Sequence, residues 1–137
     1  MLENDKLKNF LTAASLQFGT HKSNIAKQMS IALTTNLNQQ EKRIREAAPV
    51  SICLHDFLPQ KRTDLISCLA TCADALRWRE AGFGKLPKKF SKRIYASELI
   101  GPEGLFKSTE IRIGLLIQHK QLAYPKHWHA AEELYLV

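Results

Sequence analysis

Two histidines, a glutamate and two tyrosines lie within residues 124–135 of the printed sequence. His127 and His129 are two residues apart, so on a β-strand both side chains would leave the same face. Glu133 has the same parity and can join them along one strand, or across two short strands joined by a turn at 130–132. Two imidazoles and a carboxylate are a ligand set that suits zinc, iron or nickel. The spacing therefore predicts a divalent metal site, against the alternative of polar residues on a solvated strand face.

The same motif carries a resemblance to a known family. His127-Trp128-His129, followed after three residues by Glu133, resembles the first metal-binding motif of the cupins. The longer sequence resembles the dimethylsulfoniopropionate lyase branch of that superfamily, over roughly residues 63 to 137. The closest similarity lies in three segments, residues 93–102, 114–118 and 124–135.

The resemblance implies a jelly-roll fold and cleavage of dimethylsulfoniopropionate to dimethyl sulfide and acrylate at a divalent metal. Zinc, iron, manganese and nickel are the candidate ions, held by His127, His129 and Glu133. Two differences from the cupin pattern are visible. Gln121 stands six residues before the first histidine, where the general motif has glycine, and a second motif with a further histidine is absent from the printed residues. We therefore expect little or no turnover from this chain.

The predicted substrate carries a carboxylate and a sulfonium, so its elimination needs a base for the α-proton and a place for the cation. Tyr135 is the predicted base, because a divalent cation nearby would lower its pKa from the ordinary value of about 10. Tyr124 is the second candidate, as base or as a contact to the substrate. Trp128 or a tyrosine ring could face the sulfonium through a cation–π contact. Ordinary core packing is the alternative for Tyr135.

Two other functions fit the same ligands. One is another metal-dependent cupin enzyme, such as a dioxygenase or an isomerase. The other is a metal-free binding or regulatory module that keeps the β-scaffold without the chemistry. The ligand set does not separate these functions from the lyase.

Composition restricts the choice of partners. The chain has 137 residues, 45% of them hydrophobic, and a net charge of +7, which suits one folded domain. The charge could favour anionic partners, but no nucleic-acid-binding signature is present and we do not expect nucleic acid. Seven basic residues crowd into positions 77–93, which we interpret as a solvated basic hinge: Arg77, Arg79, Lys85, Lys88, Lys89, Lys92 and Arg93.

The cysteines indicate the compartment. Three cysteines and no secretory leader predict reduced thiols and a cytoplasmic protein. Cys68 and Cys72, one helical turn apart, are interpreted as buried apolar thiols rather than half of a metal site. No run of eighteen apolar residues is present, so we do not expect a membrane partner.

Apolar spacing predicts three helices in the first part of the chain. The first covers 3–18 and ends at Gly19. The second begins after an N-cap at Ser23 and continues to Pro49. Residues 50–62 are predicted to be a connection that turns Ile52, Leu54 and Phe57 inward. His55 and Asp56 in this connection are interpreted as structural or solvated residues rather than as a catalytic pair. The third helix begins at Thr63 or Asp64 and reaches Trp78 or Glu80.

From Phe90 onward, β-branched and aromatic residues with Gly-Pro punctuation predict strands. We expect strands at 110–117 and 122–129, joined by a turn at 118–120. The fold class is therefore α+β, with a helical segment (1–81) packed on a cupin-like antiparallel β-unit (82–137). A jelly roll needs about eight strands, more than this unit supplies, and the apolar run 134–137 stops without a polar tail. We expect a fragment, or a chain that completes its fold as a homodimer.

Overall fold

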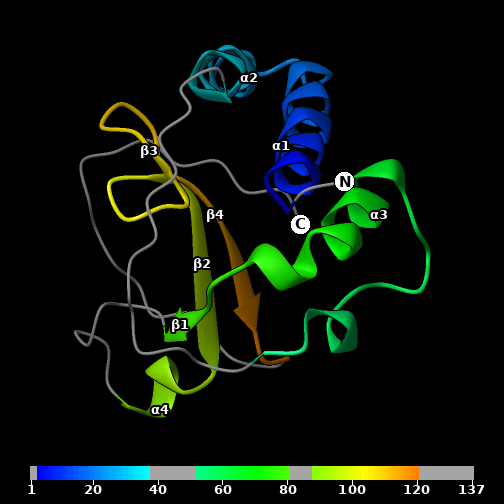
Figure 1. The fold of residues 1–137 in the computed structure, drawn as a ribbon, viewed down its shortest axis with the longest axis vertical. Coiled ribbons are helices and arrows are strands. Elements are labelled where there is room, and N and C mark those ends of the chain that lie inside the picture. Colours follow the sequence, from blue (N-terminus) through cyan, green and yellow to red (C-terminus); the bar gives the residue numbers. More distant parts are fainter. Residues whose placement is uncertain (1–2, 38–51, 81–87, 121–137) are drawn as a thin grey trace.

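The computed structural model describes residues 3–37, 52–80 and 88–120, which form an α+β architecture (Figure 1). Three longer helices lie beside a small, mainly antiparallel sheet. The helices are α1 (Glu3–Gly19), α2 (Asn24–Leu37), α3 (Asp64–Thr71) and the short α4 (Lys88–Ser91), with single turns η1 (Leu54–Asp56) and η2 (Ala73–Ala75). The strands are β1 (Arg79–Glu80), β2 (Ile94–Gly101), β3 (Phe106–Lys107) and β4 (Ile113–Gln118). The predicted α+β class is confirmed, whereas the jelly roll stays a prediction.

Helices α1 and α2 form where the apolar spacing predicts them. Helix α1 ends at Gly19, and the Ser23 hydroxyl accepts a hydrogen bond from the backbone N–H of Ala26 at 3.2 Å, which confirms the predicted N-cap. The two helices meet through hydroxyl groups, since Ser15 Oγ lies 3.0 Å from the Ser30 carbonyl oxygen and 2.9 Å from Thr34 Oγ1. The remainder of the predicted second helix, up to Pro49, lies outside the described residues.

The third helix begins where predicted but ends early. Thr63 caps it by accepting a hydrogen bond from the backbone N–H of Ile66 at 3.3 Å. The α-helix stops at Thr71 instead of Trp78 or Glu80, because a 3-10 turn follows and the chain then pairs with β2 as strand β1. Burial of Trp78, only 5% exposed, favours this extended path over the local helical pattern.

Three side chains in the connection before α3 were predicted to point inward, and the structure confirms two of them. Leu54 is buried and Ile52 packs against the core. The prediction for Phe57 is wrong, because its side chain is 44% exposed. Leu54 takes the inward position of the single turn η1, and Phe57 follows that turn on its outer side.

Strand β2 is the centre of the sheet. Strand β4 runs antiparallel to it, with Ala96 opposite Leu116, and β1 pairs antiparallel on the other side, with Ala96 opposite Arg79. Strand β3 adds a short parallel pairing at the end of β2. The predicted strand 110–117 is confirmed from Ile113 onward, and Gln118, predicted to be in a turn, is its last residue.

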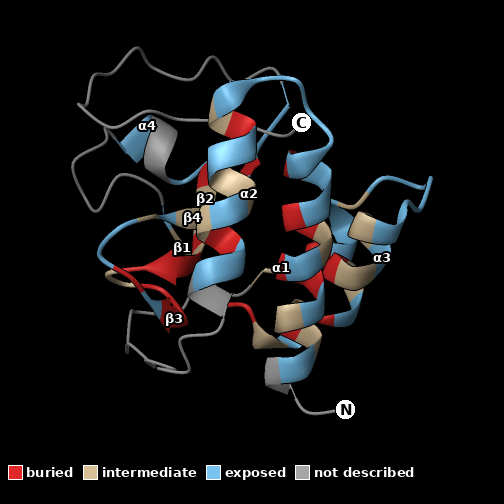
Figure 2. Cartoon of the chain, turned by 90° about the horizontal axis from the view of Figure 1, so that it is seen from above, coloured by how far each residue is buried: buried red, intermediate tan, exposed pale blue. Residues whose placement is uncertain are grey.

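The core lies between the helices and one face of the sheet (Figure 2). It joins apolar residues of α1, such as Leu11, to Leu99 of β2 and Ile117 of β4 in a single cluster. The opposite face of β2 carries Ile94 and Glu98. Helical and sheet segments therefore share one core, and their division at residue 81 stays a prediction.

Candidate functional site

The residues predicted to carry the chemistry follow β4 in the sequence. The structure describes the chain only as far as Lys120 in this region, so all of them lie outside the described residues: Tyr124, His127, Trp128, His129, Glu133 and Tyr135. The same holds for the predicted strand 122–129. The metal ligands, the base and the substrate contacts therefore stay predictions, and β4 is the described element that leads into them.

A buried carboxylate organises the sheet just before this segment. The Glu98 side chain is 6% exposed although it carries a charge. Its Oε2 accepts a hydrogen bond from the backbone N–H of Glu103 at 2.7 Å. Its Oε1 lies 2.8 Å from Nε of Arg112, whose guanidinium side chain is 56% exposed. Glu98 therefore links β2, the loop that follows it and the segment that precedes β4.

The two oxygens of Glu98 are satisfied differently. Although Arg112 Nε is close to Oε1, the pair lacks hydrogen-bond alignment, and Oε1 has no hydrogen-bond partner within the described part of the chain. The contact is an ion pair with one solvated member, which is a weak contributor to stability. The hydrogen bond from Glu103 is short and charge-assisted, and we assign it the larger contribution.

Glycines permit the close approach of the backbones around Glu98. Gly101 has a φ of 151°, and a Cβ at this position would lie 2.9 Å from Glu98 Cδ. A Cβ at Gly114, which pairs with Glu98 across the strands, would lie 2.6 Å from the carbonyl oxygen of Ser97. Strand β4 can therefore reach its position beside β2 only without a side chain at residue 114.

The role of Glu98 was not predicted from the sequence, where this residue appears only inside a segment that resembles the lyase family. One signal was available. Glu98 is the single charged residue in the stretch 94–100, and a charge within a largely uncharged stretch of this kind is rarely buried without a partner. The identity of that partner, Arg112, was not encoded in any local pattern.

The other candidate groups from the sequence give no second site. His55 and Asp56 are both exposed on η1, as expected of solvated side chains. Cys72 is buried, and burial raises the pKa of its thiol to about 11, so it is protonated at neutral pH as expected of an apolar core thiol. Cys68 is half-buried and Cys53 is exposed. Within the described ranges, no three His, Cys, Asp or Glu side chains are grouped to hold a metal ion.

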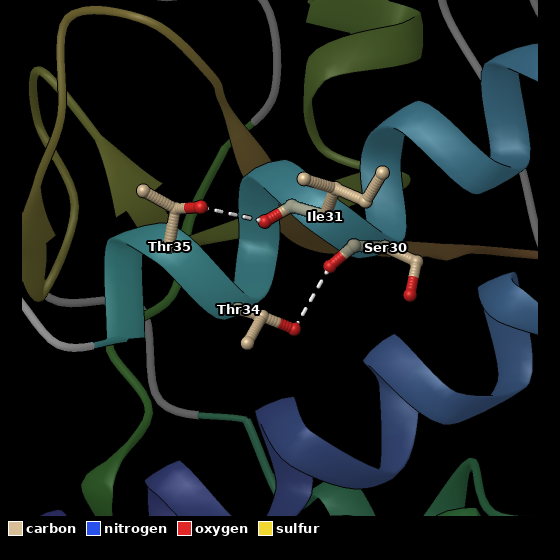
Figure 3. A pocket seen from close by; sticks show the side chains of 4 residues that line it. All are labelled: Ser30, Ile31, Thr34 and Thr35. Atoms are coloured by element: carbon tan, nitrogen blue, oxygen red, sulfur yellow. Dashed lines mark hydrogen bonds between the residues drawn. The ribbon is translucent and has the colours of Figure 1, made fainter.

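An open hollow on α2 is lined by Ser30, Ile31, Thr34 and Thr35 (Figure 3). Its threonine hydroxyls bond within the helix, Thr34 Oγ1 donating to the Ser30 carbonyl at 3.0 Å and Thr35 Oγ1 to the Ile31 carbonyl at 2.9 Å. None of the four side chains ionises near neutral pH. The hollow therefore supplies neither an acid, a base nor a charged metal ligand.

Comparison with known families finds a match for this α+β protein. The family model for dimethylsulfoniopropionate lyase matches residues 21–137, which is nearly the whole chain. The chain belongs to the dimethylsulfoniopropionate lyase family, and the resemblance seen in its sequence is confirmed. No curated protein and no solved structure matches the chain. None of the described helices is both long and apolar enough to span a membrane.

Proposed function

We propose that this chain is a metal-dependent lyase that cleaves dimethylsulfoniopropionate to dimethyl sulfide and acrylate. The observation that carries the proposal is the family match, which extends over residues 21–137 and includes the whole histidine and glutamate motif. Membership of a lyase family supports the reaction class. The roles of single residues rest on the chemistry of the side chains in that motif.

The donor set fits a divalent ion. His127 and His129 would bind through neutral ring nitrogens, and Glu133 would bind through its carboxylate, a mixed set that suits zinc, iron, manganese or nickel. When bound, the ion would supply a Lewis acid for the substrate carboxylate. No competing group of three ligands occurs in the part of the chain that the structure describes.

Side chains of this protein would remove the α-proton of the substrate and hold its sulfonium group. Tyr135 would remove the proton from the carbon next to the carboxylate, and the electron pair of that C–H bond would form the double bond of acrylate. The carbon–sulfur bond breaks, and its electron pair leaves on neutral dimethyl sulfide. Tyr124 is the second candidate base, and Trp128 is suited to hold the sulfonium through its ring face.

The experiment measures metal and product on the same preparations. Elemental analysis of protein purified without chelator should give metal near one equivalent for the wild type and a much lower value for His129→Ala. His119→Ala is the matched control, because His119 is an exposed histidine just after β4 and should leave the metal content unchanged.

Product formation tests the reaction and the base. Turnover is expected to be low, and headspace detection of dimethyl sulfide, with acrylate measured in solution, should give small and equal amounts of the two. Tyr135→Phe should abolish release, whereas Tyr95→Phe should not, because the Tyr95 hydroxyl bonds the Lys92 carbonyl. Substoichiometric metal that His129→Ala does not change would favour the metal-free binding module. Release unaffected by Tyr135→Phe would remove the assignment of the base.

A further inference from the structure

A cluster of basic residues forms where the short helix α4 meets the sheet. It comprises Lys88, Lys92 and Arg93 before β2, and His119 and Lys120 after β4; we call these five residues the basic corner. The backbone N–H of His119 donates to the Arg93 carbonyl at 3.0 Å, and that of Lys92 donates to the Lys88 carbonyl at 3.3 Å. Antiparallel pairing of β2 with β4 therefore brings two distant segments to one end of the sheet (Figure 1).

The charges of the basic corner are available to a partner. All five side chains are exposed. Among the described residues, no ion pair involves the side chains of its lysines or of Arg93. The neighbouring strand β1 contributes one acidic side chain, Glu80. Gathering four cationic side chains that have no ion-pair partner among the described residues costs electrostatic free energy, which an anionic partner would offset.

The chemistry of the corner favours a lipid surface over a macromolecular groove. Lysine predominates, and lysine is depleted in protein–protein interfaces. Helix α4 has four residues, too few to enter a nucleic-acid groove. Tyr95, whose side chain the structure describes at this corner, is half-buried beside His119, with ring centroids 6.4 Å apart, so its ring offers no free platform for base stacking. A membrane surface of anionic headgroups, by contrast, attracts any exposed positive charges that lie within about one Debye length of it.

We infer that the basic corner docks this protein on membrane surfaces that carry anionic phospholipid headgroups. The inference is independent of the proposed lyase activity. It revises the expectation that a membrane is not a partner, because that expectation rested on the absence of an apolar span. Attachment through charges requires no such span. It also gives Lys88, Lys92 and Arg93, interpreted from sequence as part of a solvated hinge, a binding role.

The test is sedimentation of the purified chain with vesicles of phosphatidylcholine, with and without phosphatidylserine. Binding should need phosphatidylserine and should weaken steeply as salt is raised to about 0.5 M. Each neutralised lysine should weaken binding about fivefold, so Lys88→Gln, Lys92→Gln and Lys120→Gln together should weaken it about 100-fold. The matched control neutralises three exposed lysines outside the corner and should change binding less than about threefold. Its substitutions are Lys22→Gln, Lys27→Gln and Lys61→Gln.

A second variant separates charge from folding. Replacing the three corner lysines by arginine keeps the charge and should keep binding, while circular dichroism monitors the fold of every variant. Equal binding to neutral and anionic vesicles would overturn the inference. Equal losses in the corner and control variants would also overturn it, because net charge alone would then explain binding. So would tight binding to random duplex DNA without binding to anionic vesicles.

Discussion

Replacing Glu98 tests how much one buried carboxylate holds the sheet together. The Glu98→Ala change removes a 2.7 Å hydrogen bond from the Glu103 backbone and the 2.8 Å ion pair with Arg112. A hydrogen bond to a charged group contributes about 1.5–3 kcal/mol. The ion pair adds at most about 1 kcal/mol, because the Arg112 side chain is 56% exposed to solvent. We therefore expect Glu98→Ala to lower the free energy of unfolding by about 2–4 kcal/mol.

Urea denaturation followed by circular dichroism measures this loss. With an m-value of about 1.5–2 kcal/mol/M, the midpoint should fall by about 1–3 M. Glu98→Gln keeps an acceptor for the Glu103 N–H and should cost roughly half as much. Arg112→Met should cost less than about 1 kcal/mol, and that cost should shrink in high salt.

The control for this series is Glu110→Gln, which removes an exposed carboxylate from the segment before β4. It should change the free energy of unfolding by less than about 0.5 kcal/mol. The reasoning would be refuted if Arg112→Met cost as much as Glu98→Ala, because the ion pair would then outweigh the backbone hydrogen bond. A loss below about 1 kcal/mol for Glu98→Ala would refute it as well.

Two further predictions concern backbone contact and core titration. Gly114→Ala should lower the free energy of unfolding by about 2 kcal/mol or more in urea, because its Cβ would meet the Ser97 carbonyl oxygen at 2.6 Å; Gly19→Ala, which meets a side-chain hydroxyl at 3.2 Å, should cost clearly less. Burial raises the pKa of Cys72 from 9.0 to about 11, so between these values the unfolded chain loses a proton that the folded chain retains. The free energy of unfolding should therefore fall by about 2 kcal/mol as pH rises from about 9 to 11. Unfolding curves measured across this pH range should show that Cys72→Ala removes this fall in the free energy of unfolding and that Cys53→Ala does not. An equal pH dependence in the wild type and both variants would contradict the prediction.

Local chemistry in the sequence predicted the beginnings of the helices and the motif of the site. The spacing of Leu7, Phe10 and Leu11 predicts an amphipathic helix because apolar residues on one face need only neighbours within the same segment. The caps at Ser23 and Thr63 are equally local, since each hydroxyl bonds a backbone N–H three residues later. The lyase family is visible in the sequence for the same reason, because its motif lies within a dozen residues.

Only the tertiary structure decided which distant groups meet. The helix that begins after Thr63 ends early because the chain beyond it pairs with β2, a partner that no pattern in that segment reveals. Glu98 meets Arg112, and Arg93 meets His119, because β2 and β4 are antiparallel in one particular register. A shift of that register by one residue would reverse the faces of β4. Contacts of this kind follow from strand pairing rather than from residue spacing, so they could not be read from the sequence.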